Sequence, residues 1–98
     1  MQIKIHEAYR AIVALCDTEL LGKYFSEGIR QIDIKEGFFK GEEKTFEEIV
    51  EILKDMEKED ATFNIVGQES VKAALQAKII KKESLIYIQG VPIALLLM

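Results

Sequence analysis

Few side chains in this 98-residue sequence have the chemistry of a nucleophile or a general base. The chain contains one cysteine, Cys16, and one histidine, His6. Asp17 and Glu19 follow the cysteine, and neighbouring carboxylates raise the pKa of a thiol and so disfavour the reactive thiolate. If the segments that carry the cysteine and the histidine pair as a hairpin, the two side chains lie roughly 20 Å or more apart along it. We therefore expect no Cys–His dyad and no catalytic residue, and favour a protein that is not an enzyme.

Metal and phosphate sites have equally little support. A metal site needs several histidines, cysteines or convergent carboxylates, whereas Asp17 and Glu19 are two carboxylates of the kind that any acidic turn carries. Residues 67–70 (Gly-Gln-Glu-Ser) stand between an expected strand and an expected helix, where backbone amides can hold an anion. They lack the Gly-Lys-Ser/Thr of a phosphate-binding loop, and Glu69 would repel phosphate from the first helical turn. We expect no metal and no cofactor.

The hydrophobic pattern predicts the elements that must position these residues. The clearest helix starts after Thr45, which can form a capping box with Glu48, and its apolar residues recur at helical spacing up to Met56. Asp17 is expected to cap a single helical turn that ends at Gly22. The complete set comprises strands at 2–6, 11–16, 29–34, 61–66, 85–88 and 92–98, helices at 46–56 and 68–78, and a loop at 37–41.

These elements predict one domain, residues 1–98, of the α+β class. We expect a two-layer sandwich in which a mostly antiparallel sheet of about five to six strands carries two helices on one face. The closing run, with Leu95, Leu96 and Leu97 in succession, must hide both of its faces. That strand is therefore expected either centrally in the sheet or against another subunit of a homodimer. The N-terminus has no apolar signal core, and the closing run is shorter than the about 20 residues that span a bilayer, which favours a cytoplasmic protein without a membrane partner.

The charge is divided unevenly along the chain. The whole sequence has a net charge of −4, but residues 42–60 alone contain nine acidic and three basic residues, a net charge of −6. Two interpretations stay open for this segment, a solvated helix face and a docking surface for a basic protein partner. A smaller cluster of lysines could contact phosphate, but without arginine or interleaved aromatic residues it makes direct nucleic-acid binding unlikely. Its members are Lys72, Lys78, Lys81 and Lys82.

Several short segments together resemble a known family. They are residues 16–23 (Cys-Asp-Thr-Glu-Leu-Leu-Gly-Lys), 27–28, 38–39 with 41–42, 64–67 (Asn-Ile-Val-Gly) with 70–71, and 90–94 (Gly-Val-Pro-Ile-Ala). In this order they are similar to the archaeal domain-of-unknown-function family 424 over nearly the whole chain. The resemblance implies an archaeal cytoplasmic protein with an α+β fold and supplies no established activity. The family pattern has a histidine where this chain has Ile93, which puts any role of that side chain in polar binding or metal chemistry in doubt here.

Two functions from different classes remain. The first is a non-catalytic module that binds another macromolecule, with a basic protein and the translation or RNA-processing machinery among the candidate partners. The second is a small-ligand binder or enzyme whose site is built from Asp17, Glu19, Lys23, Asn64 and Gly90. The resemblance directs attention to three of its segments, residues 16–23, 64–67 and 90–94. The full set of candidate binding residues is Cys16, Asp17, Glu19, Lys23, Asn64, Gly67, Ser70 and Gly90.

Overall fold

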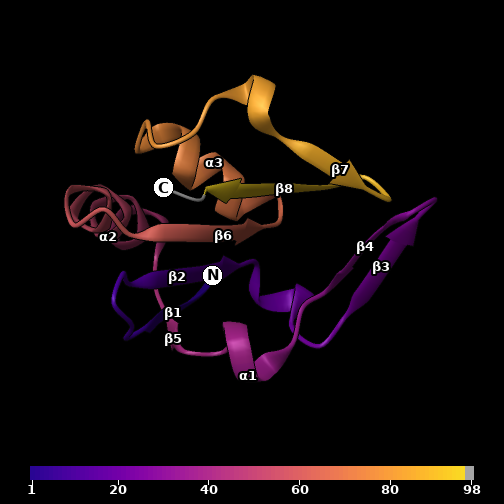
Figure 1. Cartoon of the computed structure of the whole chain (residues 1–98), viewed down its shortest axis with the longest axis horizontal. Helices are drawn as coiled ribbons and strands as arrows, with labels where there is room; N and C mark the ends of the chain where they lie inside the picture. The colour runs from indigo at the N-terminus through magenta and orange to yellow at the C-terminus, as the bar shows by residue number, and fades with distance from the viewer. Residues whose placement is uncertain (97–98) are drawn as a thin grey trace.

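A computed structural model describes residues 1–96, which form a six-stranded sheet, a separate two-stranded ribbon and two main helices (Figure 1). The strands of the large sheet lie in the order β5-β1-β2-β6-β8-β7. The elements are β1 (Gln2–His6), β2 (Ile12–Cys16), the 3-10 turn η1 (Thr18–Leu20), β3 (Tyr24–Glu27), β4 (Arg30–Asp33), α1 (Glu36–Phe39), β5 (Glu42–Glu43), α2 (Phe46–Lys58), β6 (Thr62–Val66), α3 (Gln68–Gln76), the 3-10 turn η2 (Lys82–Ser84), β7 (Ile86–Ile88) and β8 (Val91–Leu96).

The predicted α+β class is confirmed, with a sheet that is antiparallel except for one pair. Strands β2 and β6 run parallel, and the long connection between them carries β3, β4, α1, β5 and α2. Strand β2 is a continuous apolar run because it lies between β1 and β6 and four of its five residues are fully buried. The hairpin of β1 and β2 forms as predicted, with Gln2 opposite Cys16 and His6 opposite Ile12.

The two main helices cover one face of the sheet. Ile49 and Leu53 of α2 and Val71 of α3 pack in the same core as Leu15 and Phe63 of the sheet. The capping box at the start of α2 is confirmed, because the Thr45 hydroxyl accepts from the Glu48 amide while the Glu48 carboxylate accepts from the Thr45 amide. Helix α2 continues two residues beyond the predicted end, and its acidic residues stay on the solvent side.

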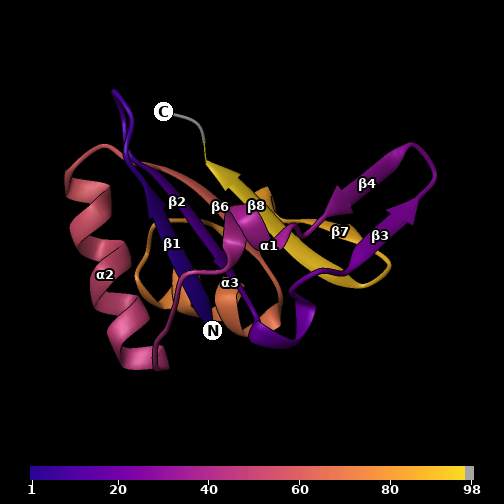
Figure 2. The ribbon, with the colours of Figure 1, turned by 90° about the horizontal axis from the view of Figure 1, so that it is seen from below.

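The opposite face is covered by segments that the sequence did not reveal as structured. The predicted loop at 37–41 is wrong, since residues Glu36–Phe39 form the short helix α1, which buries Phe39 against Cys16 and Ile93. Figure 2 shows α1 and α3 on opposite faces of the sheet. A helical turn there is favoured by burial of Phe39, which outweighs the poor helix propensity of Gly37.

The two-stranded ribbon was only half predicted. The expected strand 29–34 is shorter in the structure, Arg30–Asp33, and it pairs with the unpredicted strand Tyr24–Glu27 instead of joining the large sheet. The ribbon projects from the rest of the molecule beyond β7 (Figure 2). Its turn has Gly28 at a φ of 63°, a conformation that glycine adopts without strain.

Strand β8 occupies the position that its apolar sequence requires. It lies between β6 and β7, so the prediction of a central closing strand is confirmed for Val91–Leu96, while Leu97 lies outside the described residues. Leu95 is nevertheless 54% exposed, on the sheet face opposite α2 and α3. Association through this strand into a homodimer stays a prediction. None of the helices within residues 1–96 is long and apolar enough to cross a membrane.

Candidate binding pocket

The three segments that resemble the family pattern meet at one end of the sheet, where the parallel strands β2 and β6 end. The Asp17 amide donates to the Val66 carbonyl over 3.1 Å, and the Gly67 amide donates to the Pro92 carbonyl over 2.9 Å. These two bonds bring the end of β2, the end of β6 and the start of β8 together around a cavity of about 410 Å³. The cavity, here called the end pocket, is lined by Asp17, Glu19, Leu20, Gly67, Gln68, Glu69, Gln89, Gly90, Val91 and Pro92.

Asp17 is the buried anchor of the end pocket. Its carboxylate accepts hydrogen bonds from the Ser70 amide and the Ser70 hydroxyl, both over 2.8 Å, and from the Glu69 amide over 3.2 Å. The predicted cap of its own turn is wrong, because the side chain makes no hydrogen bond to η1. Asp17 instead satisfies the first amides of α3, since the residue at the N-cap position of that helix is Gly67, which has no side chain to do so.

Gly67 is required by this arrangement for two reasons. Its φ of 112° and ψ of 158° lie in a region that is nearly restricted to glycine. A Cβ atom at this position would also lie 2.4 to 2.7 Å from the carboxylate atoms of Asp17. The backbone at Gly67 therefore approaches the Asp17 carboxylate as closely as glycine alone permits. The amides at the N-terminus of α3 already donate to this carboxylate.

The rim of the end pocket carries further acidic groups. Glu19 on η1 and Glu69 in the first turn of α3 are both exposed there, and neither lysine nor arginine is among the lining residues. Gln89 and Gly90 form the turn between β7 and β8, both with positive φ, as a two-residue hairpin turn requires. With Asp17, the pocket brings together three carboxylates and exposes an apolar wall that includes Val91. Its charge is therefore suited to a cation and opposed to phosphate.

The predicted site residues separate into three groups. Asp17, Glu19, Gly67 and Gly90 line the end pocket. Cys16 and Ser70 are wholly buried behind it, and Ser70 takes part through its hydrogen bonds to Asp17. Lys23 and Asn64 do not line it: the Lys23 backbone pairs with Leu20 and Ile34, and Asn64 lies in the middle of β6, opposite Ala14 and Leu95. The sequence does not single out the other polar lining residues, Gln68, Glu69 and Gln89, which adjoin the predicted segments.

The side chains with nucleophilic or basic chemistry are separated from each other. Burial and the negative charge of Asp17 raise the pKa of Cys16 to about 12, so its thiol stays protonated. His6 stacks on Phe38 with ring centroids 4.6 Å apart, and its Nε2 lies 2.9 Å from the Phe38 carbonyl oxygen. The register puts His6 four residues from the partner of Cys16 along β1, about 13 Å at the rise of a strand, which is less than the roughly 20 Å expected but still beyond contact. Residues 1–96 include no group of three or more histidine, cysteine, aspartate or glutamate side chains placed to hold a metal ion.

The comparisons with known proteins agree with the resemblance seen in the sequence. The sequence profile of the family described as "Protein of unknown function (DUF424)" matches residues 6–98, a range that includes all three segments around the end pocket. The chain belongs to the DUF424 family. A search of curated proteins found no match. Among solved structures, the crystal structure of an uncharacterized conserved protein from Methanopyrus kandleri is similar, with a TM-score of 0.86 and 21% sequence identity over 97% of this chain and 88% of that one. This likeness supports the fold of the DUF424 chain.

Proposed function

We propose that this DUF424 protein is a non-catalytic binding module whose end pocket receives a basic side chain of a protein partner. The observation that carries the proposal is the convergence of the three family segments on one cavity whose charged residues are all acidic. A guanidinium or ammonium group entering it could form charge-assisted hydrogen bonds with Glu19 and Glu69. Leu20 and Val91 would contact the aliphatic part of the entering side chain.

The end pocket is better suited to this task than the acidic face of α2, which is the other candidate surface for a basic partner. On α2 the carboxylates of Glu47, Glu51 and Asp55 are exposed on a convex helix. Lys54 lies 4.0 Å from the Glu51 carboxylate, so part of the negative charge is offset within the helix. Exposed ion pairs of this kind contribute little binding energy because solvent screens them. A concave site loses less of its charge interaction to solvent.

A peptide titration followed by NMR tests the proposal. ¹⁵N-labelled protein is titrated with the blocked peptide acetyl-(Gly-Arg)₃-amide, and acetyl-(Gly-Gln)₃-amide serves as the uncharged control. We expect amide shifts at Glu69, Gln89 and Gly90 with the arginine peptide alone. Removing both rim charges by Glu19→Gln with Glu69→Gln should weaken binding about tenfold or more, because one hydrogen bond to a charged group is worth about 1.5–3 kcal/mol.

A matched double variant on α2 separates the two acidic surfaces. Glu47→Gln with Glu51→Gln removes the same number of charges from exposed positions and should leave the affinity for the arginine peptide within about twofold. Amide shifts at residues of α2, together with loss of affinity in the α2 variant alone, would place the binding site on that helix and refute binding in the end pocket. Absence of any shift with the arginine peptide would refute a site for basic side chains altogether.

A further inference from the structure

A second groove lies on the other side of Gln68, and its chemistry is opposite to that of the end pocket. It has a volume of about 260 Å³ and is bounded by α3, η2 and β7. Its lining includes Gln68, Lys72, Leu75, Lys82, Leu85 and Tyr87. No aspartate or glutamate lines it. We call this cavity the lysine groove.

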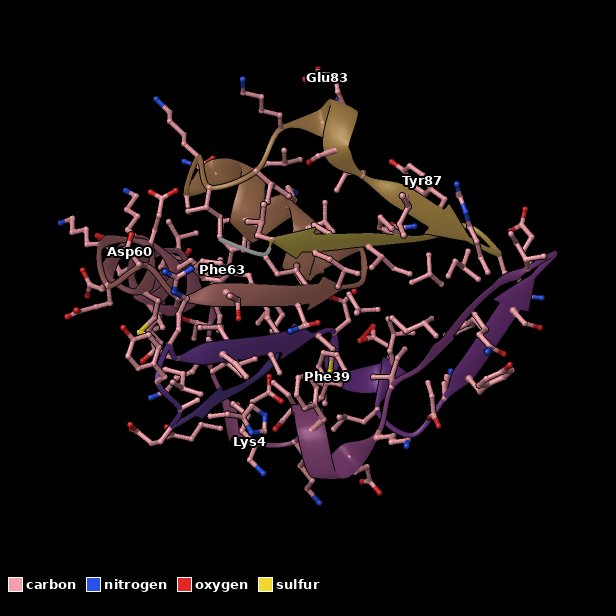
Figure 3. All side chains as sticks on the ribbon, viewed as in Figure 1. Lys4, Phe39, Asp60, Phe63, Glu83 and Tyr87 are labelled. Carbon is pink, nitrogen blue, oxygen red and sulfur yellow. The ribbon has the colours of Figure 1, made fainter. Side chains whose placement is uncertain are left out.

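Tyr87 supplies the aromatic surface that the lysine cluster lacks in the sequence. It stands on the edge strand β7 and is 54% exposed, although it is a large apolar ring (Figure 3). It lies fifteen positions after Lys72 in the sequence, and the fold brings both residues into the lining of one groove. Val71, Leu75, Leu85 and Pro92 form the apolar part of the lining. An exposed aromatic ring between apolar side chains and lysines is the arrangement on which a nucleic-acid base stacks.

The charge around the lysine groove is available to a ligand. Lys72 and Lys82 are exposed and form no ion pair with any side chain in residues 1–96. Lys78 and Lys81 line a separate depression, and Lys81 directly precedes Lys82 in the sequence. Two acidic residues, Glu69 and Glu83, adjoin lining residues in the sequence, but neither lines the groove, and Glu83 lies at the outer tip of η2 in Figure 3. A negatively charged ligand in the groove would meet two lysines, Lys72 and Lys82.

We infer that the lysine groove binds single-stranded nucleic acid, with one unpaired base stacked on Tyr87 and the flanking phosphates held by Lys72 and Lys82. The Gln68 side chain, with one donor and one acceptor group, stands in the same groove and can hydrogen-bond a base edge. The lysine groove attracts the phosphates of the strand, and the acidic regions of the chain repel them. The end pocket and α2 repel phosphate and restrict the strand to the lysine side. This inference rests on a different observation from the proposed function, and either can fail without the other.

Fluorescence anisotropy with labelled eight-nucleotide strands of oligo(A) and oligo(dA) tests the inference. Tyr87→Ala should weaken binding about 5- to 150-fold, the range that corresponds to the loss of one stacked base, while Tyr87→Phe should retain it. Lys72→Gln with Lys82→Gln should reduce the dependence of log K on log salt concentration by about 1.4, because each phosphate contact on a single strand contributes about 0.7. Circular dichroism on each variant checks that it folds.

Control variants and a duplex distinguish binding in the lysine groove from general attraction to lysines. Lys54→Gln with Lys58→Gln removes two exposed lysines from α2, the same number as in the groove variant, and should leave binding unchanged. A duplex of the same length should bind more weakly than either strand, because its bases are not free to stack on a side chain. Equal affinity of the wild type and Tyr87→Ala for both strands, or no binding of either strand at 20 mM salt, would overturn the inference. If the inference holds, tighter binding of oligo(A) than of oligo(dA) would identify RNA as the ligand, and the reverse order would identify DNA.

Discussion

The Asp17 carboxylate organises the end pocket, and its removal should have a large cost in stability. Asp17→Ala deletes three hydrogen bonds, two from the first amides of α3 and one from the Ser70 hydroxyl. Loss of a helix cap costs about 0.5–2 kcal/mol. The Ser70 hydroxyl, in a residue that is wholly buried, would lose its acceptor, which costs about 1–3 kcal/mol. Together these effects predict a decrease of about 1.5–5 kcal/mol in the free energy of unfolding.

Urea denaturation followed by circular dichroism at pH 7 measures this decrease. For a domain of this size each kcal/mol corresponds to about 4–8 °C in Tm, so a thermal scan should show a fall of about 6 °C or more. Asp17→Asn is the matched control, because its amide oxygen can still accept from α3, and we expect it to cost about half as much or less. A double-mutant cycle with Ser70→Ala isolates the contribution of the buried hydroxyl.

Two results would refute this account of Asp17. A decrease below about 1 kcal/mol in Asp17→Ala would mean that the carboxylate does not satisfy buried donors, since an ordinary surface substitution stays within about 0.5 kcal/mol. The same decrease in the Ser70→Ala background as in the wild type would mean that the two side chains are not coupled. Either result would mean that the Asp17 carboxylate explains neither the need for glycine at position 67 nor the shape of the end pocket.

Three further predictions follow from the same structure. Gly67→Ala should destabilise the fold by about 2–5 kcal/mol in urea denaturation, because it adds backbone strain and forces Asp17 off the α3 amides. Cys16 should react with a thiol reagent at pH 8 only after unfolding, because it is buried and its pKa is raised to about 12. The pKa of Glu43 is lowered from 4.5 to about 2, chiefly by its hydrogen bond from the Met1 amino group. The stability that Glu43 contributes should therefore be present above about pH 4.5 and be lost as the pH falls towards 2. Urea midpoints measured across this pH range should therefore fall less steeply in Glu43→Gln than in the wild type.

Each of these predictions has a specific control. Gly90→Ala also places alanine at a positive φ, 79°, but with no heavy atom near the new Cβ, so it should cost less than Gly67→Ala. Equal costs would show that contact with Asp17 is not the cause. Rapid reaction of Cys16 in the native protein would contradict its burial. Identical pH profiles for the wild type and Glu43→Gln would contradict the lowered pKa.

The elements that local sequence specifies were predictable. The capping box at Thr45 and Glu48, followed by apolar residues at helical spacing, identifies α2 because both signals act within a few residues of each other. The continuous apolar run of β2 identifies a central strand, because a strand buried on both faces does not alternate. Helix α1 was missed because tertiary burial of Phe39, rather than local propensity, favours it. Strand β3 was missed because four residues, only one of them partly buried, give no clear alternation.

The segments that form the candidate site were predictable from the sequence, but their meeting around one cavity was not. The three segments could be named from their residues, but their meeting depends on the parallel pairing of β2 with β6, which are separated by a connection of 45 residues from Asp17 to Ala61. The bond from Ser70 to Asp17 likewise joins residues 53 positions apart. Lys23 and Asn64 belong to the same segments in the sequence, but neither lines the end pocket in the fold. Tyr87 likewise shares a groove with Lys72 only in the folded chain, because β7 and α3 are separate elements that both line it.

Intermolecular NOEs between the acetyl-(Gly-Arg)₃-amide peptide and the methyl groups of this DUF424 protein test the central claim most directly. Leu20 and Val91 have the methyl groups in the lining of the end pocket, and Val50 lies beside the acidic residues of α2. A basic side chain bound in the end pocket predicts NOEs from the arginine CβH₂, CγH₂ and CδH₂ protons to Leu20 and Val91, and their loss in the Glu19→Gln, Glu69→Gln variant. NOEs to Val50 with none to Leu20 or Val91 would contradict the account.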